Sequence, residues 1–462
     1  MTSPTSVVGV EEEAVGNASS KVTLLSLKWP VIPASKEAQR TYNPIRAIVD
    51  PFLASVQEHD KSYISLALGD PSSYFPPCPV VVQAIQQHLL QSTGYIPAVG
   101  MLSARQAIAS HSNCENGVPT LHVTPDHVII TNGCSGALEL LFRATLQPPH
   151  DVLLIPCPGF PLYNVICHSL GCQTQSYPLK YNNETEEWYM DLVELETLLQ
   201  QPNNHHFKAI LINNPSNPTG AVFSKTHLQK FLQLCDKYHL MVISDEIYGD
   251  MTLHDRCAFH SLANVRNDMI PSPHVPIIQA SGLGKQYLVP GWRVGWLVFH
   301  DNIYGTLQSI RHGAQQLAQV IMGASHVVQW AIPAALTSTG PDDTTIVVWK
   351  QEWRHKLRQQ AHAVERVLRQ SPYLKVYHPQ GAMYLMVQIV PPRRQSIVKT
   401  DAEWTRELLR QENVLVLPGS CFGMKASDNF FRIVFGAPTA VLEEAGHRII
   451  SFLEQACVNV TE

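Results

Sequence analysis

Residues 281–296 read SGLGKQYLVPGWRVGW, and this stretch places one lysine in surroundings that suit carbonyl chemistry. Lys285 follows a run of small residues that lets the backbone come close to a ligand, and Arg293 stands further along the same segment. A lysine near a cation in a mostly apolar segment loses proton affinity, so it can attack carbonyls as the free amine. The stretch alone leaves open the alternative of an ordinary loop lysine with a structural arginine.

Length and composition exclude several classes of protein. The chain has 462 residues, which is too long for one core, so two domains or a large domain with a smaller lobe are expected. A net charge of −5 without a basic run argues against binding of nucleic acid or an anionic membrane. The ten cysteines form no CxxC pair and His205-His206 has no second ligand pair, which argues against a metal site and a disulfide framework. Because no apolar window is long enough to span a membrane and the N-terminus lacks a signal or transit pattern, the expected location is cytoplasmic.

Short apolar runs alternate with helical patterns along most of the chain. Strands are predicted at residues 127–133, 151–156, 207–215, 241–246 and 275–282, and helices lie between them. This alternation indicates an α/β fold with a mostly parallel sheet flanked by helices. The expected division is a disordered stretch at 1–20, an arm with part of the small domain at 21–76, a large domain at 77–335 and a small α+β domain at 336–462.

Chemically interesting residues follow the predicted strands, at the edge where ligands bind in such sheets. Asp245 ends one strand, so its carboxylate could hold a protonated heteroaromatic nitrogen, and Tyr248 could reach an oxygen of the same ligand. A helix cap with a core tyrosine is the alternative. The turn of Gly133, Cys134 and Ser135 between a strand and a helix is a candidate phosphate cradle, although many strand-to-helix turns look similar.

Three further side chains complete the candidate site. Asn217 precedes a proline in NNPSNPTG, a turn that exposes its amide unless it is only structural. Phe160 in PCPGFPLY could stack on a flat cofactor or pack in the core. Arg432 in NFFRIVF is a cation in an apolar strand, and either a substrate carboxylate or a structural salt bridge would offset its cost. Together these residues specify a site for pyridoxal 5′-phosphate, because no other common cofactor needs this set.

Ten segments in order resemble the fold-type I aminotransferases of the aspartate aminotransferase superfamily. They run from about Trp29 to the C-terminus: TYNPIRAIVD, LALGDP, GYIPAVGMLSARQAIA, TNGCSGALEL, PCPGFPLY, NNPSNPTG, SDEIYGDM, KQYLVPGWRVGW, GAMYLMV and NFFRIV. The resemblance implies a pyridoxal-phosphate enzyme with a large domain and a smaller α+β domain. It also implies a homodimer in which each subunit completes the site of the other.

The resemblance assigns a role to each candidate residue. Lys285 would form the imine with the cofactor and carry the proton, and Asp245 would keep the ring nitrogen protonated. Tyr248 and Asn217 would bind the ring oxygen, and Phe160 would stack on the ring. The phosphate would be held by Gly133, Cys134, Ser135, Arg293 and Tyr95, the last contributed by the neighbouring subunit. Arg432 would bind the substrate α-carboxylate, beside Asn217 and Tyr95.

Two positions depart from the family pattern. Relatives often carry a hydroxyl three residues before the lysine, where this chain has Gly282, and Ser281 is the neighbouring candidate. Some relatives carry an arginine for a distal carboxylate near the motif that here reads AQVIMG, and the corresponding residue is Val320. Without that charge, aromatic and apolar donors such as tyrosine, phenylalanine, tryptophan, methionine and leucine are expected, with pyruvate or 2-oxoglutarate as acceptor.

Other activities share this scaffold. Alanine or kynurenine transamination and β-elimination from a cysteine conjugate use the same proton abstraction, so they remain the alternatives among enzymes. A non-catalytic binding module is the alternative from another class, and the presence of Lys285, Asp245 and Arg432 argues against it.

Overall fold

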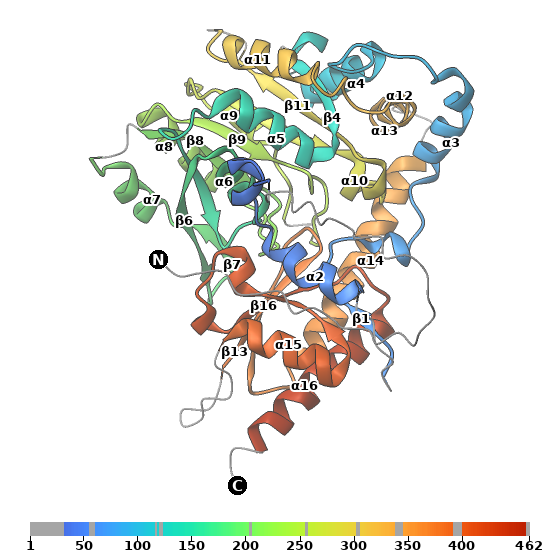
Figure 1. Cartoon of the computed structure of the whole chain (residues 1–462), viewed down its shortest axis with the longest axis vertical. Helices are drawn as coiled ribbons and strands as arrows, with labels where there is room; N and C mark the ends of the chain where they lie inside the picture. The colour runs from blue at the N-terminus through green and yellow to red at the C-terminus, as the bar shows by residue number, and fades with distance from the viewer. Residues whose placement is uncertain are drawn as a thin grey trace, which may run out of the picture.

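The structure, a computed structural model, describes residues 32–54, 61–115, 118–119, 123–202, 206–254, 257–301, 305–337, 345–390 and 400–458. The stretch at 1–20 that was expected to be disordered lies outside these ranges. In Figure 1 the large sheet and its helices fill the upper part of the molecule, and a smaller sheet with α15 and α16 fills the lower part. The exact domain boundaries given above stay a prediction.

An eight-stranded mixed sheet forms the centre of the larger part. The five strands from β10 to β6 are parallel, β11 is antiparallel to both of its neighbours, and β7 is antiparallel to β6. The prediction of a mostly parallel sheet is therefore confirmed. In spatial order the strands are β4 (Val128–Asn132), β11 (Val294–His300), β10 (Ile277–Gly282), β9 (Met241–Asp245), β8 (Phe207–Asn213), β5 (Val152–Cys157), β6 (Gln173–Asn182) and β7 (Glu187–Met190).

Helices cover both faces of this sheet, as the apolar strands require. On β9, Val242 packs into the core on one face and Ile243 into the core on the other, because successive side chains of a strand alternate. The first face is covered by α4 (Leu102–Asn113), α8 (Lys225–Lys237), α9 (Leu262–Asn267) and α13 (Ala331–Leu336), and the second by α5 (Gly133–Thr145), α6 (Leu162–Leu170) and α11 (Gln308–Ala318). The remaining short elements are β2 (Cys114–Glu115), β3 (Val118–Pro119), α3 (Pro79–His88), α7 (Leu192–Leu199), α10 (Leu283–Gln286) and α12 (His326–Gln329).

The smaller part has its own antiparallel sheet and core. Its strands lie in the order β12 (Leu374–Tyr377), β13 (Tyr384–Ile389), β16 (Phe430–Val434) and β15 (Leu417–Pro418). The helices α14 (Thr345–Leu368), α15 (Asp401–Glu412) and α16 (Thr439–Val458) belong to it, with buried side chains of all three in the same cluster. The early strand β1 (Ile64–Ser65) pairs with β14 (Val414–Leu415), which ties the start of the chain to this part.

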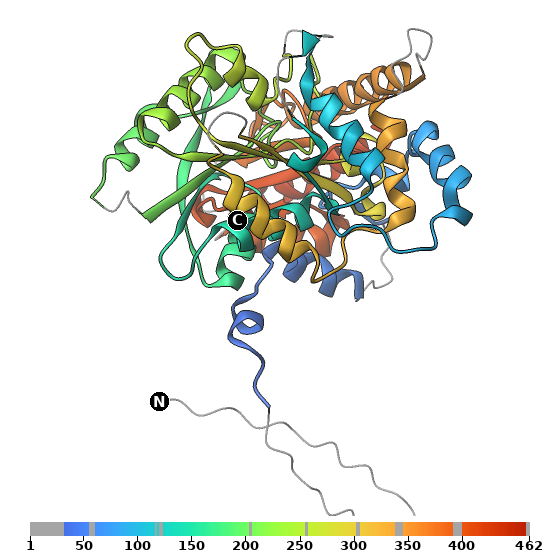
Figure 2. The ribbon, with the colours of Figure 1, turned by 90° about the horizontal axis from the view of Figure 1, so that it is seen from above.

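The N-terminal arm contains α1 (Lys36–Arg40) and α2 (Pro44–Ala54). Figure 2 shows the segment that carries α1 extending away from the body, and Ile32 and Tyr42 in it are 82% and 68% exposed. Arg40 holds the arm to α6 by donating to the backbone oxygens of His168 and Ser169 at 3.0 and 2.9 Å. The helix α2 contains Pro51 in its interior.

The sequence did not identify several elements, and for the strands β6 and β11 the omission has a physical reason. The strand β6 presents mostly polar side chains because it lies near the edge of the sheet, so its apolar alternation is weak. The strand β11 directly follows the lysine segment without a polar linker that would mark its start. The hairpin partner β7 and the helix α16 were also not predicted.

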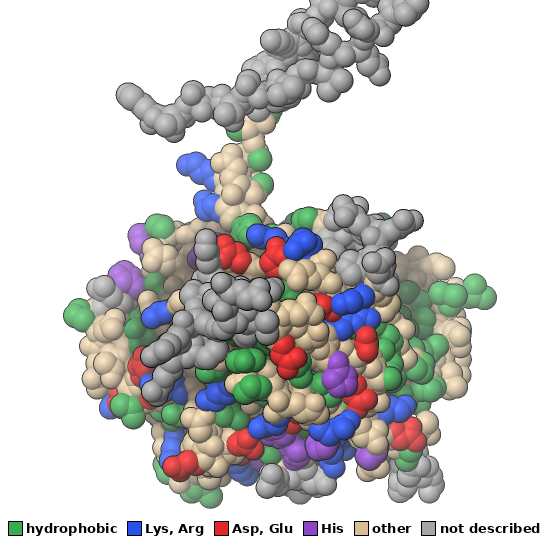
Figure 3. Space-filling model, turned by 90° about the horizontal axis from the view of Figure 1, so that it is seen from below, with side chains coloured by type: hydrophobic (Ala, Val, Ile, Leu, Met, Phe, Trp, Pro, Cys, Tyr) green, Lys and Arg blue, Asp and Glu red, His purple; other side chains and the backbone are tan. Residues whose placement is uncertain are grey.

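The surface carries charges of both signs. Figure 3 shows Lys and Arg side chains interspersed with Asp and Glu over one face, without an extended area of one sign. None of the helices in the described ranges is long and apolar enough to cross a membrane.

Candidate active site

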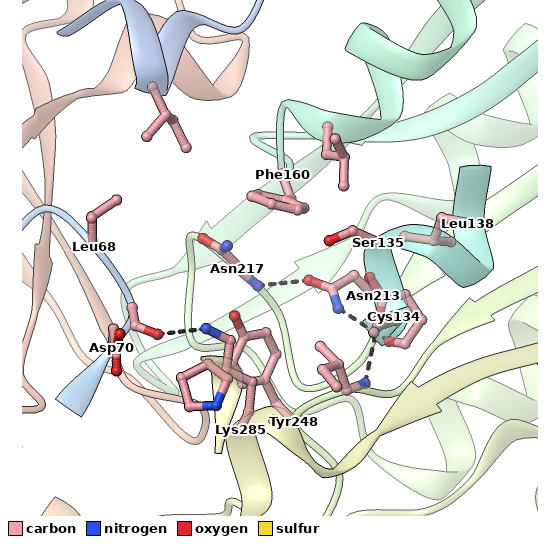
Figure 4. A pocket seen from close by; sticks show the side chains of 18 of the residues that line it. Leu68, Asp70, Cys134, Ser135, Leu138, Phe160, Asn213, Asn217, Tyr248 and Lys285 are labelled. Atoms are coloured by element: carbon pink, nitrogen blue, oxygen red, sulfur yellow. Dashed lines mark hydrogen bonds between the residues drawn. The ribbon is translucent and has the colours of Figure 1, made fainter. Parts of the chain in front are cut away.

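A cavity of about 580 Å³ lies where the large sheet, the helix α2 and the strand β16 meet. Figure 4 shows Lys285, Tyr248, Asn217, Ser135 and Phe160 around it. Most of the predicted site residues line this cavity: Gly133, Cys134, Ser135, Phe160, Asn217, Asp245, Tyr248, Lys285, Arg293 and Arg432. Three of the five predicted strands end at the cavity, at Gly133, Asn213 and Asp245, whereas Pro156 and Ser281 do not line it.

Lys285 lies in the short helix α10, one turn after β10 ends. Its Nζ donates a hydrogen bond to the backbone oxygen of Gly69 at 2.5 Å, an oxygen contributed by the loop between β1 and α3 (Figure 4). The amine therefore points into the cavity and toward neutral groups. No ion pair of Lys285 occurs within the described ranges.

Asp245 is the last residue of β9 and is 3% exposed. Its Oδ2 accepts a hydrogen bond from the Tyr163 hydroxyl at 2.8 Å, and its Oδ1 accepts from the Ile247 amide at 3.3 Å and from the Cys134 thiol at 3.6 Å. Burial raises the pKa of Asp245, and these donors act in the opposite direction. The described Lys and Arg residues form no ion pair with it, so the carboxyl can accept a cationic ligand.

The turn between β4 and α5 forms a narrow cradle. Gly133 has φ 76°, and a Cβ atom at this position would lie 2.7 Å from an Arg293 guanidinium nitrogen. Arg293 itself has φ 55° and donates to the Asn132 backbone oxygen at 3.2 Å. The guanidinium and the N-terminal amides of a 13-residue helix thus face the same space. Positive charge and free amides at one helix start are the arrangement that binds phosphate.

Arg432 lies in the middle of β16 and is 2% exposed. Its Nη1 donates to Asn217 Oδ1 at 2.7 Å, its Nη2 donates to the Ala67 backbone oxygen, and its Nε has no hydrogen-bond partner among the described residues. The guanidinium carbon lies 4.5 Å from the ring centre of Tyr384. No carboxylate in the described ranges pairs with Arg432, and burial lowers its pKa. A buried cation that contacts only neutral groups is costly, so this position is prepared for an anionic ligand.

Two hydrogen-bonded pairs fix the other side of the cavity. Asn213 donates to the Asp245 backbone oxygen at 3.0 Å and accepts from the Asn217 amide at 2.7 Å, which sets the turn that carries Asn217 (Figure 4). The hydroxyls of Tyr248 and Tyr384 lie 2.5 Å apart. The pKa of Tyr248 is raised, mainly by burial and secondly by the nearby Tyr384, so its hydroxyl stays protonated.

Four positions that the sequence singled out lie outside the cavity. Ser281 donates to the Glu246 backbone oxygen at 3.3 Å and lines a second pocket, which does not contain Lys285. At Gly282 a Cβ would lie 2.5 Å from the Val294 backbone oxygen, so this backbone has no room for a hydroxyl side chain. Tyr95 is 93% exposed and Val320 is 72% exposed.

The structure adds residues that the sequence did not single out. Tyr163 and Asn213 support Asp245, Tyr384 contacts Tyr248 and Arg432, and Arg46 lines the cavity from α2. A signal was present for Tyr163, since PCPGFPLY places a tyrosine three residues after Phe160. For Arg46 no signal was available, because the contact depends on how the arm packs against the cavity.

These groups fit pyridoxal phosphate. The cradle at Gly133 and Arg293 suits its phosphate, the buried Asp245 suits its ring nitrogen, and the unpartnered Nε of Arg432 suits a substrate carboxylate. The Lys285 amine lies in the same cavity.

Comparisons with known proteins agree with this geometry. A sequence profile described as aminotransferase class I and II matches residues 61–449. The tyrosine aminotransferase of Homo sapiens is 37% identical to this chain over 454 residues, which cover 96% of this chain and 92% of the relative. The tyrosine aminotransferase of Caenorhabditis elegans is 36% identical over 430 residues, which cover 92% of this chain and 85% of the relative. The crystal structure of tyrosine aminotransferase from Leishmania infantum superposes with a TM-score of 0.79 at 30% identity and covers 92% of this chain and 99% of that chain. Alanine aminotransferase from Pyrococcus furiosus also gives 0.79 at 30% identity, covering 92% and 100%.

The chain therefore belongs to the class I and II aminotransferases. It is a fold-type I enzyme that depends on pyridoxal phosphate, as the sequence predicted.

Proposed function

We propose that this aminotransferase moves the amino group of L-tyrosine, and of other aromatic or apolar amino acids, to a 2-oxo acid such as pyruvate or 2-oxoglutarate in a ping-pong cycle. The observation that carries the proposal is Arg432, a buried cation without a carboxylate partner in the described ranges, in one cavity with Lys285 and Asp245. The names of the human and nematode relatives support tyrosine as the donor.

Each residue around the cavity has a separate role in the reaction. Bound pyridoxal phosphate supplies an electron sink for the charge that develops at the substrate α-carbon. Lys285 Nζ takes the proton from that carbon, and Asp245 keeps a proton on the ring nitrogen by holding it as an ion pair. Tyr248 and Asn217 donate hydrogen bonds to the ring oxygen. Arg432 orients the substrate through its α-carboxylate.

The cofactor is held at the other end of the cavity. The phosphate is bound by Gly133, Cys134, Ser135 and Arg293, and the ring is stacked against Phe160. Ser281 is left out of this assignment, because its hydroxyl donates to the Glu246 backbone outside the cavity.

We further infer that two copies of the chain form a homodimer in which Tyr95 of one subunit reaches the phosphate of the other. Tyr95 has a 93% exposed side chain, which suits a group that contacts a second subunit rather than its own. Exposed apolar side chains at Leu90, Val320 and Ile321 provide surface that a partner would cover.

A half-reaction titration tests the substrate proposal. L-tyrosine, L-methionine, L-alanine and L-glutamate are added separately to the purified enzyme without an oxo acid, and the visible absorbance of the cofactor is followed. The expected result is fast conversion by tyrosine and methionine and slow conversion by glutamate, because Val320 stands at the position that corresponds by sequence to an arginine for a distal carboxylate. Val320 lies outside the cavity of its own chain and Arg46 lines it, so fast conversion by glutamate would assign the distal carboxylate to Arg46. Equal rates for glutamate and tyrosine would contradict the aromatic preference.

The alternatives predict different products. An alanine aminotransferase, the activity named for the Pyrococcus furiosus structure, would convert fastest with alanine in this titration. A kynurenine aminotransferase would prefer kynurenine in the same assay. A β-lyase would release pyruvate and ammonia from a cysteine conjugate without added oxo acid.

A further inference from the structure

The carboxylate of Asp245 is held by two side-chain donors that lie on different helices. Tyr163, in the first turn of α6, is 0% exposed, and its hydroxyl lies 2.8 Å from Oδ2. Cys134, in the first turn of α5, places its thiol 3.6 Å from Oδ1. The two oxygens thus have different donors, and the Ile247 amide at 3.3 Å is the third.

Both side chains are fixed as donors. The pKa of Tyr163 and that of Cys134 are both raised, mainly by burial and secondly by the negative charge of Asp245. The hydroxyl and the thiol therefore keep their protons. A neutral donor that faces a carboxylate stabilises its charged form. Removing the donor would therefore raise the proton affinity of Asp245, in a place where burial already favours the neutral acid.

We propose that Tyr163 is the positioning residue that keeps Asp245 ionised, so that the shared proton resides on the cofactor ring nitrogen, with Cys134 as a weaker second donor. The inference rests on the proposed role of Asp245. A carboxyl with a higher proton affinity would draw the proton away from the ring, and a neutral ring withdraws less charge from the substrate α-carbon. The titratable groups that face this carboxyl are Tyr163, Cys134 and Tyr248, and the cations Arg293 and Lys285 act on the neighbouring Cys134 thiol.

Tyr163 also connects the ring-stacking and ring-nitrogen contacts. Phe160 lies three residues earlier, and its ring packs edge-on against Tyr163 with centres 5.7 Å apart. A single helix start thus supplies the group above the ring and the donor behind Asp245. The change Tyr163→Phe removes only the hydroxyl and preserves this ring contact.

The chain offers a matched control in Tyr177. Its side chain is 1% exposed in β6, and its hydroxyl donates to the Leu211 backbone oxygen at 2.9 Å, away from the residues that line the cavity. Tyr177→Phe therefore removes a buried hydroxyl of the same kind without touching Asp245. A general loss of stability would appear in both variants.

The test measures the protonation of the ring nitrogen directly, in the holoenzyme loaded with ¹⁵N-labelled pyridoxal phosphate. The ¹⁵N chemical shift is followed against pH in the parent enzyme, Tyr163→Phe, Tyr177→Phe and Asp245→Asn. For Tyr163→Phe we expect a shift toward the unprotonated value, a kcat lower by about 10-fold with little change in KM for tyrosine, and an acidic limb of the kcat profile that moves to higher pH. Cys134→Ala should show a smaller change in the same direction, because its thiol is the longer contact.

The outcomes separate this inference from the proposed function. If Asp245→Asn moves the ¹⁵N signal and Tyr163→Phe leaves it and kcat unchanged, the role of Tyr163 is refuted and that of Asp245 stands. If Asp245→Asn itself leaves the signal unchanged, the assignment of Asp245 fails. Equal losses in Tyr163→Phe and Tyr177→Phe would make the effect structural and would also overturn the inference.

Discussion

At the residue scale, the site is defined by buried charged groups that have no partner of opposite charge among the described residues. Within the described part of the chain, Arg432 donates to neutral acceptors and Asp245 accepts from neutral donors, and neither has an ion-pair partner there. Burying such groups costs free energy unless a ligand of opposite charge completes them. Opposite charges at the two positions match a cofactor with a protonated ring and a substrate with a carboxylate.

The cofactor-free protein should show this cost as a dependence of stability on pH. Burial raises the pKa of Asp245 in the folded state, so between the unfolded and folded pKa values the folded state binds more protons. The free energy of unfolding therefore falls as pH rises through that window. In Asp245→Asn this fall should be smaller, because the group no longer ionises. Thermal melts of both cofactor-free proteins between about pH 4 and pH 8 measure the difference, and parallel curves would contradict it.

At the scale of elements, the phosphate cradle depends on how α5 begins. Gly133 adopts a left-handed conformation and lies against the Arg293 guanidinium, and Gly295 on β11 lies against the Gly133 backbone. A side chain at position 133 would be strained and would displace Arg293 from the helix start. The helix dipole and the guanidinium would then no longer converge on one point.

Gly133→Ala should therefore weaken cofactor binding by about 10-fold or more, a figure that corresponds to about 1.4 kcal/mol. Gly136→Ala is the control on the same helix, since its Cβ would have its nearest neighbour at 3.5 Å and the backbone there is helical. That variant should bind the cofactor normally and be as stable as the parent or slightly more so. Fluorescence titration of cofactor-free protein with pyridoxal phosphate measures both, and equal affinities in the two variants would argue against the cradle.

At the scale of the whole molecule, the proposed dimer makes a prediction about mixed subunits. Lys285→Ala should abolish turnover, and Tyr95→Ala should weaken phosphate binding. In a hybrid dimer one site would carry both defects, and the other would combine an intact Lys285 with an intact Tyr95 from its partner. Co-expression of the two variants with different tags, followed by isolation of the hybrid, should thus restore about half of the parent activity.

The hybrid also separates the two possible positions of Tyr95. If Tyr95 served the site of its own subunit, the hybrid would be no more active than the average of the two parent variants. Recovery of activity would require that the side chain crosses the interface. The size of the purified parent enzyme by light scattering provides the control, because a monomer would exclude the scheme.

The sequence alone determined the local features of the fold and the site, but not the contacts between distant residues. Residue type and spacing were sufficient for the parallel sheet, the cofactor class and many of the residues that line the cavity, because strand ends and turns are local patterns. Lys285, Asp245, Asn217 and Arg432 are recognisable since each is a polar group in an otherwise apolar or turn segment. A polar residue in an apolar or turn segment can be recognised from the sequence alone, without knowledge of the fold.

Only the tertiary structure decided which donors support those groups. Tyr163 and Cys134 meet Asp245 from two different helices, and Gly69 accepts from Lys285 across the cavity. It also showed that Ser281 contacts Glu246 outside the cavity and that the backbone at Gly282 has no room for a side chain. These contacts join residues far apart in the chain, and their geometry follows from how sheets and helices pack. Local periodicity carries no information about that packing.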